Sequence, residues 1–327
     1  MGEVIGASLC DGRDDRAEGE LVERVRRLPH RVAGELLFEQ IVTSGGQRRR
    51  RLVALHRACG FAHEAVRGLR AWRWRRRVKA LRLVGPVASE AEFAELLERA
   101  KDAPLVRVLA AQSFARLGRA DHVVTLLAAV KLDNPLMEAP LAMALEQLTT
   151  EDLGRVLARW DAFVCSRVQR RLLITATRRG AVGFRKRVEA AAQSPDFELR
   201  IGACDAAGNV DAVWSRHLLF HGLRDIDWRV RAHAAKRLGR CARGAAIDSL
   251  AEALGDSAFW VRQNAARALR RCGREGLIRL ARAARGKESD PFAAQVAAQE
   301  LHRERAWSRR RPRTMPIVSG PGWQPPV

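Results

Sequence analysis

Few residues in this chain stand at spacings that catalysis or metal binding requires. His217 and His221 are four positions apart, so on a helix both imidazoles would face one side, as two metal ligands do. Neither a glutamate of the HExxH kind nor an obvious third ligand accompanies them. The sequence also holds no glycine-rich phosphate loop and no nucleophile motif around a serine or cysteine. We therefore predict a protein without a catalytic residue, a metal site or a cofactor.

The cysteines favour a cytosolic protein with reduced thiols. None of the six forms a CxxC pair, and their neighbours are apolar or helix-forming residues. A redox or metal-binding pair is the less favoured alternative. The cysteines stand at positions 10, 59, 165, 204, 241 and 272.

Arginine and small apolar residues recur in this chain at a period of 31. The segment that begins at Val106 resembles those that begin at Val230 and Val261, and the matching positions form a series of constant spacing. A fixed period of this length indicates stacked supersecondary units. The members of the series, which we call anchors, are 75, 106, 137, 168, 199, 230, 261 and 292.

Each anchor is expected to open a helix. Positions 0, +4, +5 and +8 from the anchor are mostly apolar and small, and they fall on one face at about 100° per residue. A second apolar-periodic run, such as 247–254, precedes each anchor, so the unit is helix, turn, helix. This pattern predicts an all-α fold, an α-solenoid of about eight 31-residue repeats. Aspartates suited to helix N-caps stand before most anchors, at Asp102, Asp133, Asp196, Asp227, Asp256 and Asp290.

These repeats resemble HEAT repeats of the short phycobilisome-lyase type, whose DxxVRxxAAxALxxLG consensus survives best at 227–239 and 256–273. The resemblance covers roughly residues 70–302. It is specific for the fold and not for function, because this repeat serves scaffolds, lyase subunits and enzymes alike. HEAT-type deoxyhypusine hydroxylases carry repeated His-Glu pairs for a di-iron centre, whereas this chain has a single pair, His63-Glu64, outside the repeats.

Trp72–Arg76 at the first repeat, Phe259–Ala266 at the seventh and a degenerate last repeat carry a narrower resemblance. They are similar to bacterial HEAT-repeat proteins encoded beside family-2 glycosyltransferases. That resemblance implies a partner in polysaccharide synthesis and an N-terminal membrane helix before an arginine-rich stretch. Arg48–Arg51 and Arg73–Arg77 supply the stretch, but residues 1–47 contain no spanning helix. Either this member is soluble or its true start lies upstream.

One position after the anchor, at +1, the repeat most often carries arginine. This position lies within the apolar stripe of the helix. We therefore expect these side chains to donate to loop carbonyls or to an aspartate of a neighbouring unit, as a ladder along the solenoid. The ladder arginines are Arg107, Arg200, Arg231 and Arg262.

The opposite helix face, at +3, +6 and +10, is polar and mildly basic. In HEAT arrays the second helix lines the concave surface, and neighbouring helices stack about 8–10 Å apart. Such a strip suits an extended acidic segment or helix better than a small molecule; an ordinary solvated face is the alternative. The candidate partner-binding residues are Arg116, Arg171, Arg178, Asn209, His233, Lys236, Arg240, Asn264, Arg267 and Arg271.

Tryptophans stand where loops lead into anchor helices. Side chains there either wedge between repeats or form exposed aromatic anchors on the loop ridge, the residue type that dominates interface energetics. The ridge aromatics are Trp72, Trp74, Trp228 and Trp260.

The net charge of +22, from 59 basic and 37 acidic residues, is unevenly placed. Residues 21–86 hold 17 basic residues against four acidic ones, a net +13, while residues 87–301 carry only +8. The charge therefore indicates a basic arm on a nearly ordinary solenoid. Such an arm suits anionic lipid, where each basic residue contributes on the order of 1 kcal/mol, or nucleic acid, and the sequence does not distinguish the two.

The composition divides the chain into four parts. Residues 1–20 are expected to be a disordered acidic segment, 21–70 a basic helical arm, 71–302 the solenoid, and 303–327 a disordered tail rich in arginine and proline. Within the arm, one helix is interrupted or begins near Pro29 and a second covers 49–69. The sequence shows no secretory signal and no stretch long enough for a membrane helix.

We therefore expect a monomeric, non-catalytic scaffold that binds a protein partner through its concave face and loop ridge. It would be cytoplasmic, with peripheral contact at the inner face of the cell membrane through the arm. The alternative is a nucleic-acid-binding HEAT-like protein, although HEAT-like DNA glycosylases have longer and irregular repeats. A HEAT-type enzyme or lyase subunit is the less favoured third reading.

Overall fold

The computed structural model describes residues 27–44, 46–61, 104–116, 118–132, 134–241, 244–286 and 290–310, together with residues 23, 25, 63, 67, 68, 73 and 80. All regular elements within these ranges are helices, and none is a strand. The predicted all-α class is therefore confirmed. The chain divides into two compact units, 1–191 and 192–327.

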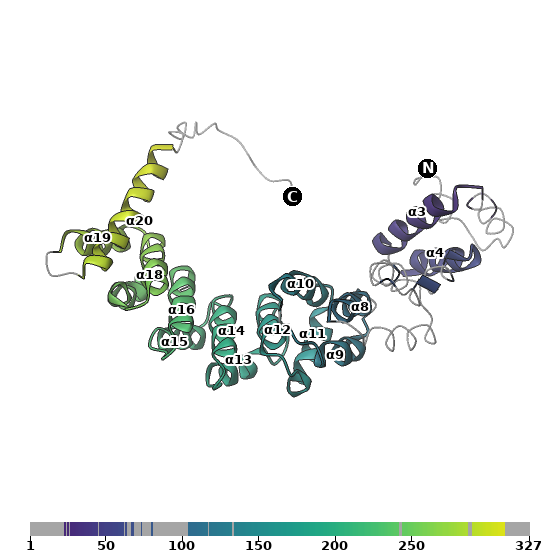
Figure 1. Ribbon diagram of the computed structural model, residues 1–327, viewed down its shortest axis with the longest axis horizontal. Coiled ribbons are helices and arrows are strands. Elements are labelled where there is room, and N and C mark those ends of the chain that lie inside the picture. The colour runs from purple at the N-terminus through teal and green to yellow at the C-terminus, as the bar shows by residue number, and fades with distance from the viewer. Residues whose placement is uncertain are drawn as a thin grey trace, which may run out of the picture. The chain divides into compact units, whose positions relative to one another are not determined.

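In the first unit, helices that contain or directly follow an anchor alternate with second helices (Figure 1). We call the former anchor helices. They are α8 (Pro104–Arg116), α10 (Glu138–Glu146), preceded by the short turn η1 (Pro135–Met137), and α12 (Ser166–Arg179). The second helices are α9 (Ala120–Ala128), α11 (Thr150–Ala158), followed by η2 (Trp160–Ala162), and α13 (Phe184–Ala192).

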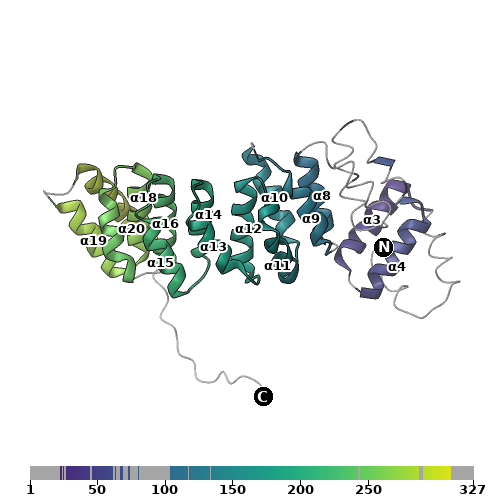
Figure 2. The same ribbon diagram turned by 90° about the horizontal axis from the view of Figure 1, so that it is seen from below.

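The second unit continues the alternation. Its anchor helices stand in a row that we call the anchor layer, and α15 and α19 lie on one side of that row (Figure 1). Helices α14 and α16 run side by side (Figure 2). The anchor helices are α14 (Phe197–Ala207), α16 (Trp228–Cys241), α18 (Phe259–Arg271) and α20 (Pro291–Arg310). The second helices are α15 (Val213–Gly222), α17 (Ile247–Glu252), flanked by η3 (Gly244–Ala246) and η4 (Ala253–Gly255), and α19 (Arg274–Arg285).

Every anchor from 106 to 292 falls in or directly before a described anchor helix, so the 31-residue repeat is confirmed in this range. The repeat at anchor 75 lies outside the described residues. The apolar stripe forms the core: Val230, Ala234, Ala235 and Leu238 are buried in α16. Because most of these side chains are small, the helices can approach closely.

Gly239 marks the closest approach between α16 and α18. A Cβ atom there would lie 2.6 Å from Cα of Ala268, a separation that real Cβ atoms do not adopt. The two helices therefore pack with their backbones nearly in contact, and side chains on the adjoining faces are brought together.

Aspartates before the anchors cap helices as predicted, with one exception. The Oδ1 atoms of Asp196, Asp227 and Asp290 each accept the backbone N–H two residues further on. Asp256 is not a cap: Ala258 occupies the N-cap position of α18, and Asp256 binds a neighbouring repeat instead. That prediction is wrong because Asp256 stands five residues before its anchor, as Asp225 does, and Ala258 takes the place that Asp196 and Asp227 hold three residues before theirs. Asp102 and Asp133 lie outside the described residues.

The arm folds as a pair of helices, α3 (His30–Thr43) and α4 (Gly46–Ala58). The first helix begins directly after Pro29, and its Leu37 and Ile41 pack with Leu52 of α4. The predicted second helix over 49–69 is too long, because α4 ends at Ala58 and a turn through Gly60, with a φ of +80°, follows. His56 is buried against the ring of Phe61, and burial, then the charge of Arg57, lowers its pKa to about 4. Residues 1–20 lie outside the described residues.

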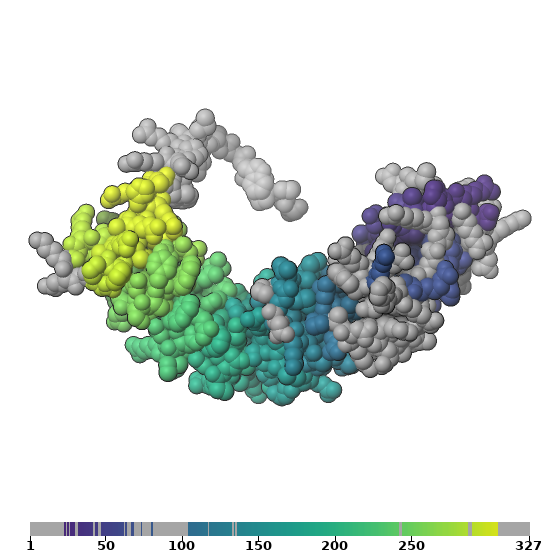
Figure 3. Space-filling view, viewed as in Figure 1, coloured from purple at the N-terminus to yellow at the C-terminus, as the bar shows by residue number. Residues whose placement is uncertain are grey.

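The last helix runs past the predicted start of the tail. Helix α20, yellow in Figure 3, packs against α18 and α19. It ends at Arg310. The predicted boundary between solenoid and tail at 303 is wrong, because side chains beyond it bind α18 and α20. Arg303 donates a hydrogen bond to Glu300, and Glu304 accepts one from Arg270. Residues 311–327 are not described. Within the described ranges, none of the helices is both long and apolar enough to cross a membrane.

Candidate functional site

The arginines at +1 join consecutive repeats of the second unit. Nε and Nη2 of Arg200 donate to the two oxygens of Asp225 at 2.7 and 3.0 Å, and those of Arg231 donate to Asp256 at 2.7 and 2.9 Å. Nη1 of each arginine donates to two carbonyls of the loop before its own helix. The bond to the carboxylate raises the pKa of each arginine. These side chains are engaged in structure and are not available to a partner.

Two further arginines at +1 bind loop carbonyls. Nη1 of Arg107 donates to the carbonyl of Ala129 at 3.2 Å. Nη1 of Arg262 donates to the carbonyls of Asp256 and Ser257 at 2.7 and 2.9 Å, as in the two rungs before it. The buried Nε atom of Arg262, however, has no hydrogen-bond partner.

In the first unit, glutamates of α10 neutralise the candidate arginines of α12. Nη2 of Arg171 donates to Glu138 at 2.9 Å, and Arg178 pairs with Glu146. Both pairs join neighbouring anchor helices. These two candidate residues therefore present no unpaired charge.

In the second unit, four candidate cations gather on the anchor layer. Lys236 and Arg240 stand one turn apart on α16, and Arg267 and Arg271 one turn apart on the adjacent α18; we call these four the cationic quartet. Burial lowers the pKa of Arg271, and so do the charges of Arg240, Arg270 and Arg267. Arg267 lies 3.5 Å from a carboxylate oxygen of Glu300, but the side chains of Lys236, Arg240 and Arg271 make no hydrogen bond or ion pair within the described ranges. The structure thus brings like charges together with little compensation.

The other predicted face residues of the second unit are turned toward structure. Nδ1 of His233 lies 2.8 Å from Asp205, and Nδ2 of Asn264 donates to the carbonyl of Ala232 at 2.9 Å. Asn209, and Arg116 in the first unit, are also engaged. Lys236, Arg240 and Arg271 are therefore the residues of the predicted face that keep unpaired charge.

The structural roles of two buried carboxylates on anchor helices were not predicted from the sequence. Asp205 accepts from Nε of Arg237 at 2.9 Å as well as facing His233. Glu300 is fully buried and accepts from Nε2 of Gln263, Nε of Arg270 and Nη1 of Arg303. A signal was present in the sequence, because Glu300 stands at +8, where every other repeat carries an apolar residue.

Aromatic side chains line the loop ridge at the other end of the anchor helices. Trp228 and Trp260, in the first turns of α16 and α18, are 42% and 53% exposed, which fits an exposed anchor better than a wedge. Phe259 and Phe292, which the sequence reasoning missed, are more than half exposed, and Phe259 packs edge-on against Trp260. We call these four residues the aromatic ridge. Trp72 and Trp74 lie outside the described residues.

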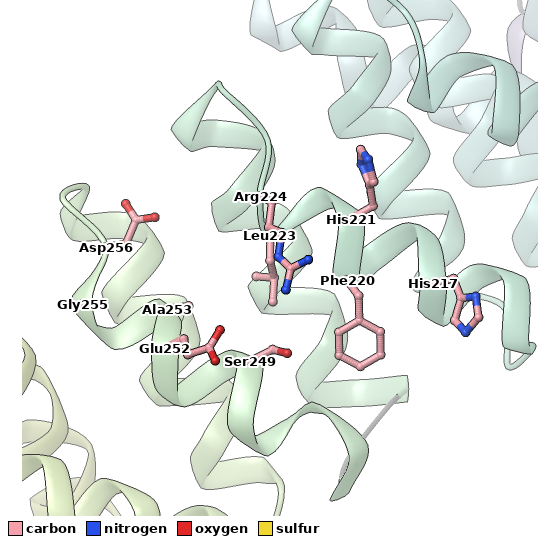
Figure 4. Close-up of a pocket in the computed structure, with 10 residues that line it drawn as sticks. All are labelled: His217, Phe220, His221, Leu223, Arg224, Ser249, Glu252, Ala253, Gly255 and Asp256. Atoms are coloured by element: carbon pink, nitrogen blue, oxygen red, sulfur yellow. The ribbon is translucent and has the colours of Figure 1, made fainter.

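A cavity of about 550 Å³ lies between the second helices α15 and α17 (Figure 4). Phe220, Leu223 and Arg224 line one side, with Ser249 and Glu252 on the other. The imidazoles of His217 and His221, both exposed, point in different directions and do not converge on a common ligand (Figure 4). Within the described ranges, no three histidine, cysteine or acidic side chains cluster as metal ligands would.

The described cysteines are free thiols. Burial raises the pKa of the Cys204 thiol, and burial likewise raises that of Cys241. A thiol kept protonated in this way is a poor nucleophile. Cys10 lies outside the described residues.

Against this geometry, residues 216–302 match the family model described as HEAT repeats. This segment resembles HEAT repeats. It spans most of α15 to most of α20 and contains both the cationic quartet and the aromatic ridge. No curated protein matches the chain. The resemblance to the phycobilisome-lyase type of repeat and a partner in polysaccharide synthesis remain predictions.

Solved structures resemble the chain at low identity. A crystal structure of an engineered protein shares 15% identity at a TM-score of 0.39, covering 92% of this chain and 98% of its own. The YibA protein of Escherichia coli shares 16% at 0.38, covering 90% and 99%. Human deoxyhypusine hydroxylase in complex with glycerol shares 18% at 0.30, covering 75% and 96%. Nothing about the function of this chain follows from these likenesses.

Proposed function

We propose that this chain is a non-catalytic HEAT-repeat scaffold whose cationic quartet binds an acidic segment of a protein partner. The observation that carries the proposal is the grouping of four cations on two touching helices, of which only Arg267 forms an ion pair, with Glu300 at 3.5 Å. The four are Lys236, Arg240, Arg267 and Arg271. Like charges one turn apart on a helix are unfavourable. A ligand that brings carboxylates to them removes that repulsion.

The arrangement of the quartet favours an extended acidic segment. Its cations lie about one helical turn apart along each helix and about one helix diameter apart across the pair, a spacing of roughly 5–10 Å in both directions. Successive acidic residues of a peptide or helix can meet such an array, whereas one small anion meets one or two of its members.

Nucleic acid is a weaker fit than an acidic protein segment. A phosphate backbone needs a continuous track of cations. In the first unit Glu138 and Glu146 neutralise the corresponding arginines, and in α14 the position of Lys236 is the acidic Asp205. The unpaired charge is therefore a patch and not a track.

The basic arm would add a peripheral contact with an anionic membrane surface. Its apolar side chains, among them Leu37, Ile41 and Leu52, are buried in its own small core, so they are not free to insert into lipid. Arg48 and Arg50 of α4 are exposed. Contact with a membrane would then be electrostatic and would weaken with salt.

Fluorescence anisotropy with a labelled oligoglutamate peptide tests the quartet. The full chain should bind the peptide, and replacing Arg240 and Arg271 by alanine should weaken binding about tenfold or more, since two charge-assisted contacts are lost. A matched control removes the same charge elsewhere: Arg282→Ala with Arg285→Ala changes two exposed arginines of α19. Equal weakening in both double variants would overturn the proposal, because net charge alone would then explain binding.

A competition experiment compares the two macromolecular partners. Duplex DNA added at physiological salt should displace the peptide only at concentrations far above those of unlabelled oligoglutamate. Sub-micromolar displacement that requires Arg240 and Arg271 would instead establish the nucleic-acid alternative.

Flotation with vesicles containing anionic lipid tests the arm. The full chain should float with the vesicles, and a chain that starts near Ala88 should not. Equal flotation of both chains would contradict a membrane role for the arm.

A further inference from the structure

The arginine ladder lacks a carboxylate at its last described rung. The aspartates that bind Arg200 and Arg231 stand 25 residues after each arginine, at Asp225 and Asp256. The same step from Arg262 leads to Lys287. A lysine cannot accept a hydrogen bond, so the repeat does not supply this rung with its usual partner.

Arg262 nevertheless takes the position of the arginines before it. Its Nη1 atom holds two carbonyls of the preceding loop, as Nη1 of Arg231 does. The edge formed by Nε and Nη2 is the one to which Asp225 and Asp256 bind in the earlier rungs. In Arg262 the side chain is 8% exposed and Nε has no partner. A buried donor without a partner is costly and rare in folded proteins.

Apolar surface surrounds this rung. The ring of Phe292 lies with its centre 5.1 Å from Cζ of Arg262, and Phe292 itself is more than half exposed. Phe259 and Trp260, three and two positions before Arg262 on α18, are likewise more than half exposed. Exposed aromatic side chains beside an arginine are the residue types that anchor protein interfaces.

We propose that Arg262 binds the carboxylate of an aspartate or glutamate in an extended segment of a partner protein, whose neighbouring apolar side chains pack on Phe259, Trp260 and Phe292. The incoming carboxylate takes the place that Asp225 and Asp256 hold in the earlier rungs, with two parallel hydrogen bonds from Nε and Nη2. Nε is closed to solvent in the free chain, so side chains beside Arg262 must move as the ligand enters.

This site is distinct from the cationic quartet. Arg262 stands in the first turn of α18, whereas Arg271 closes the same helix at its other end. The quartet recognises accumulated negative charge. The rung recognises one carboxylate with apolar neighbours. An experiment can therefore reject binding at the quartet without rejecting binding at Arg262, and the reverse.

The test uses the full chain and a fluorescein-labelled peptide with one aspartate between leucines, beside the same peptide with asparagine. The aspartate peptide should bind at least about tenfold more tightly than the asparagine peptide, because the paired hydrogen bonds need a carboxylate. Lys287→Asp restores the ladder pattern from within the chain and should abolish this preference. Lys287→Ala, which removes the same lysine without adding a carboxylate, should keep it.

Four results would overturn the inference. Equal affinity for the two peptides, or equal binding by Lys287→Asp and Lys287→Ala, would show that the rung does not receive the carboxylate. Binding that emerges only after Glu288→Gln would show that the chain fills its own rung. The Arg240→Ala and Arg271→Ala double variant should bind the aspartate peptide normally, and a loss there would assign the peptide to the quartet instead.

Discussion

The same repeat position carries a neutralised arginine in one unit of the molecule and bare arginines in the other. Arg178 of α12 stands at +10 and pairs with Glu146, while Arg240 and Arg271 stand at +10 in α16 and α18 without a partner. Glu146 occupies +9 of its repeat. In α14 and α16 that position is Gly208 and Gly239. A glutamate one helix back thus neutralises the arginine in the first unit, whereas in the second unit glycine lets the helices close up and leaves the charge free.

Arginine therefore has two uses in one fold. Where a carboxylate and loop carbonyls bind it, as at Arg231, arginine joins repeats. Where other cations lie beside it and no carboxylate binds it, as at Arg240, it offers a surface to an anion. Removing the first kind should cost stability, and removing the second should cost binding.

The largest expected effect is on a ladder rung. Arg231→Ala leaves the nearly buried Asp256 without its partner and frees the carbonyls of Asp225 and Ile226. We expect the free energy of unfolding of the second unit to fall by about 2–3 kcal/mol. Urea unfolding followed by circular dichroism measures this. A loss below about 0.5 kcal/mol, the range of ordinary surface changes, would contradict a structural role for the ladder.

The same rung predicts a dependence on pH. Burial raises the pKa of Asp256, but hydrogen bonds from Arg231 and the N–H of Ala258, with the charges of Arg231 and Arg262, outweigh it and leave the pKa below its usual 3.8. The unfolded chain then takes up this proton first, so the stabilisation is present above pH 3.8 and is lost as the pH falls below that value. Asp256→Asn should be less stable than the native chain at pH 7, and the difference should shrink as the pH drops below 3.8. A constant difference down to pH 2 would refute the ionic rung.

Gly239 tests the close packing that groups the quartet. Gly239→Ala places a Cβ atom 2.6 Å from Ala268, so α16 and α18 must separate. We expect a loss of about 1–2 kcal/mol in thermal or urea unfolding. Gly244→Ala is the control, since a Cβ atom there meets nothing within 4 Å. Similar effects of the two changes would mean that the helices do not touch as described.

The smallest effects distinguish the paired arginine from the bare one. Arg178→Ala removes an exposed ion pair and should cost about 0.5 kcal/mol, whereas Arg240→Ala relieves repulsion and should leave stability unchanged or raise it by a few tenths. Both differences should fade in about 1 M salt, where charges are screened. The reverse order of the two variants would undo the contrast between the units.

The fold followed from the sequence because its cause is periodic. Small residues at +4 and +5 and an apolar residue at +8 recur in register, so helices, turns and core positions can be read directly from them. Where the period breaks, the reasoning failed. Glu300 interrupts the apolar stripe and binds donors from α18 and α20. Ala258 stands where earlier repeats carry the N-cap aspartates Asp196 and Asp227.

The candidate site was only partly readable. The helical wheel placed Arg178, Arg240 and Arg271 on one face but said nothing of which neighbour neutralises each. That outcome depends on side chains from the adjacent helix, Glu146 in one case and glycine in the others, and it needs the packing as well as the period. Of the aromatic ridge, the sequence predicted only the two tryptophans. Nothing in the sequence apart from residue type indicated that Phe259 and Phe292 would be exposed there.

Reversing the charge of the quartet is the most direct test of whether its bare arginines form the binding surface. Arg240→Glu with Arg271→Glu changes two exposed side chains that make no contact with the ladder, so the chain should keep its unfolding midpoint to within the range of surface changes. We predict that this variant loses oligoglutamate binding and gains binding to oligolysine, measured by anisotropy at the same salt. Retention of oligoglutamate binding by the reversed chain would contradict the claim that the bare arginines of α16 and α18 are its binding surface.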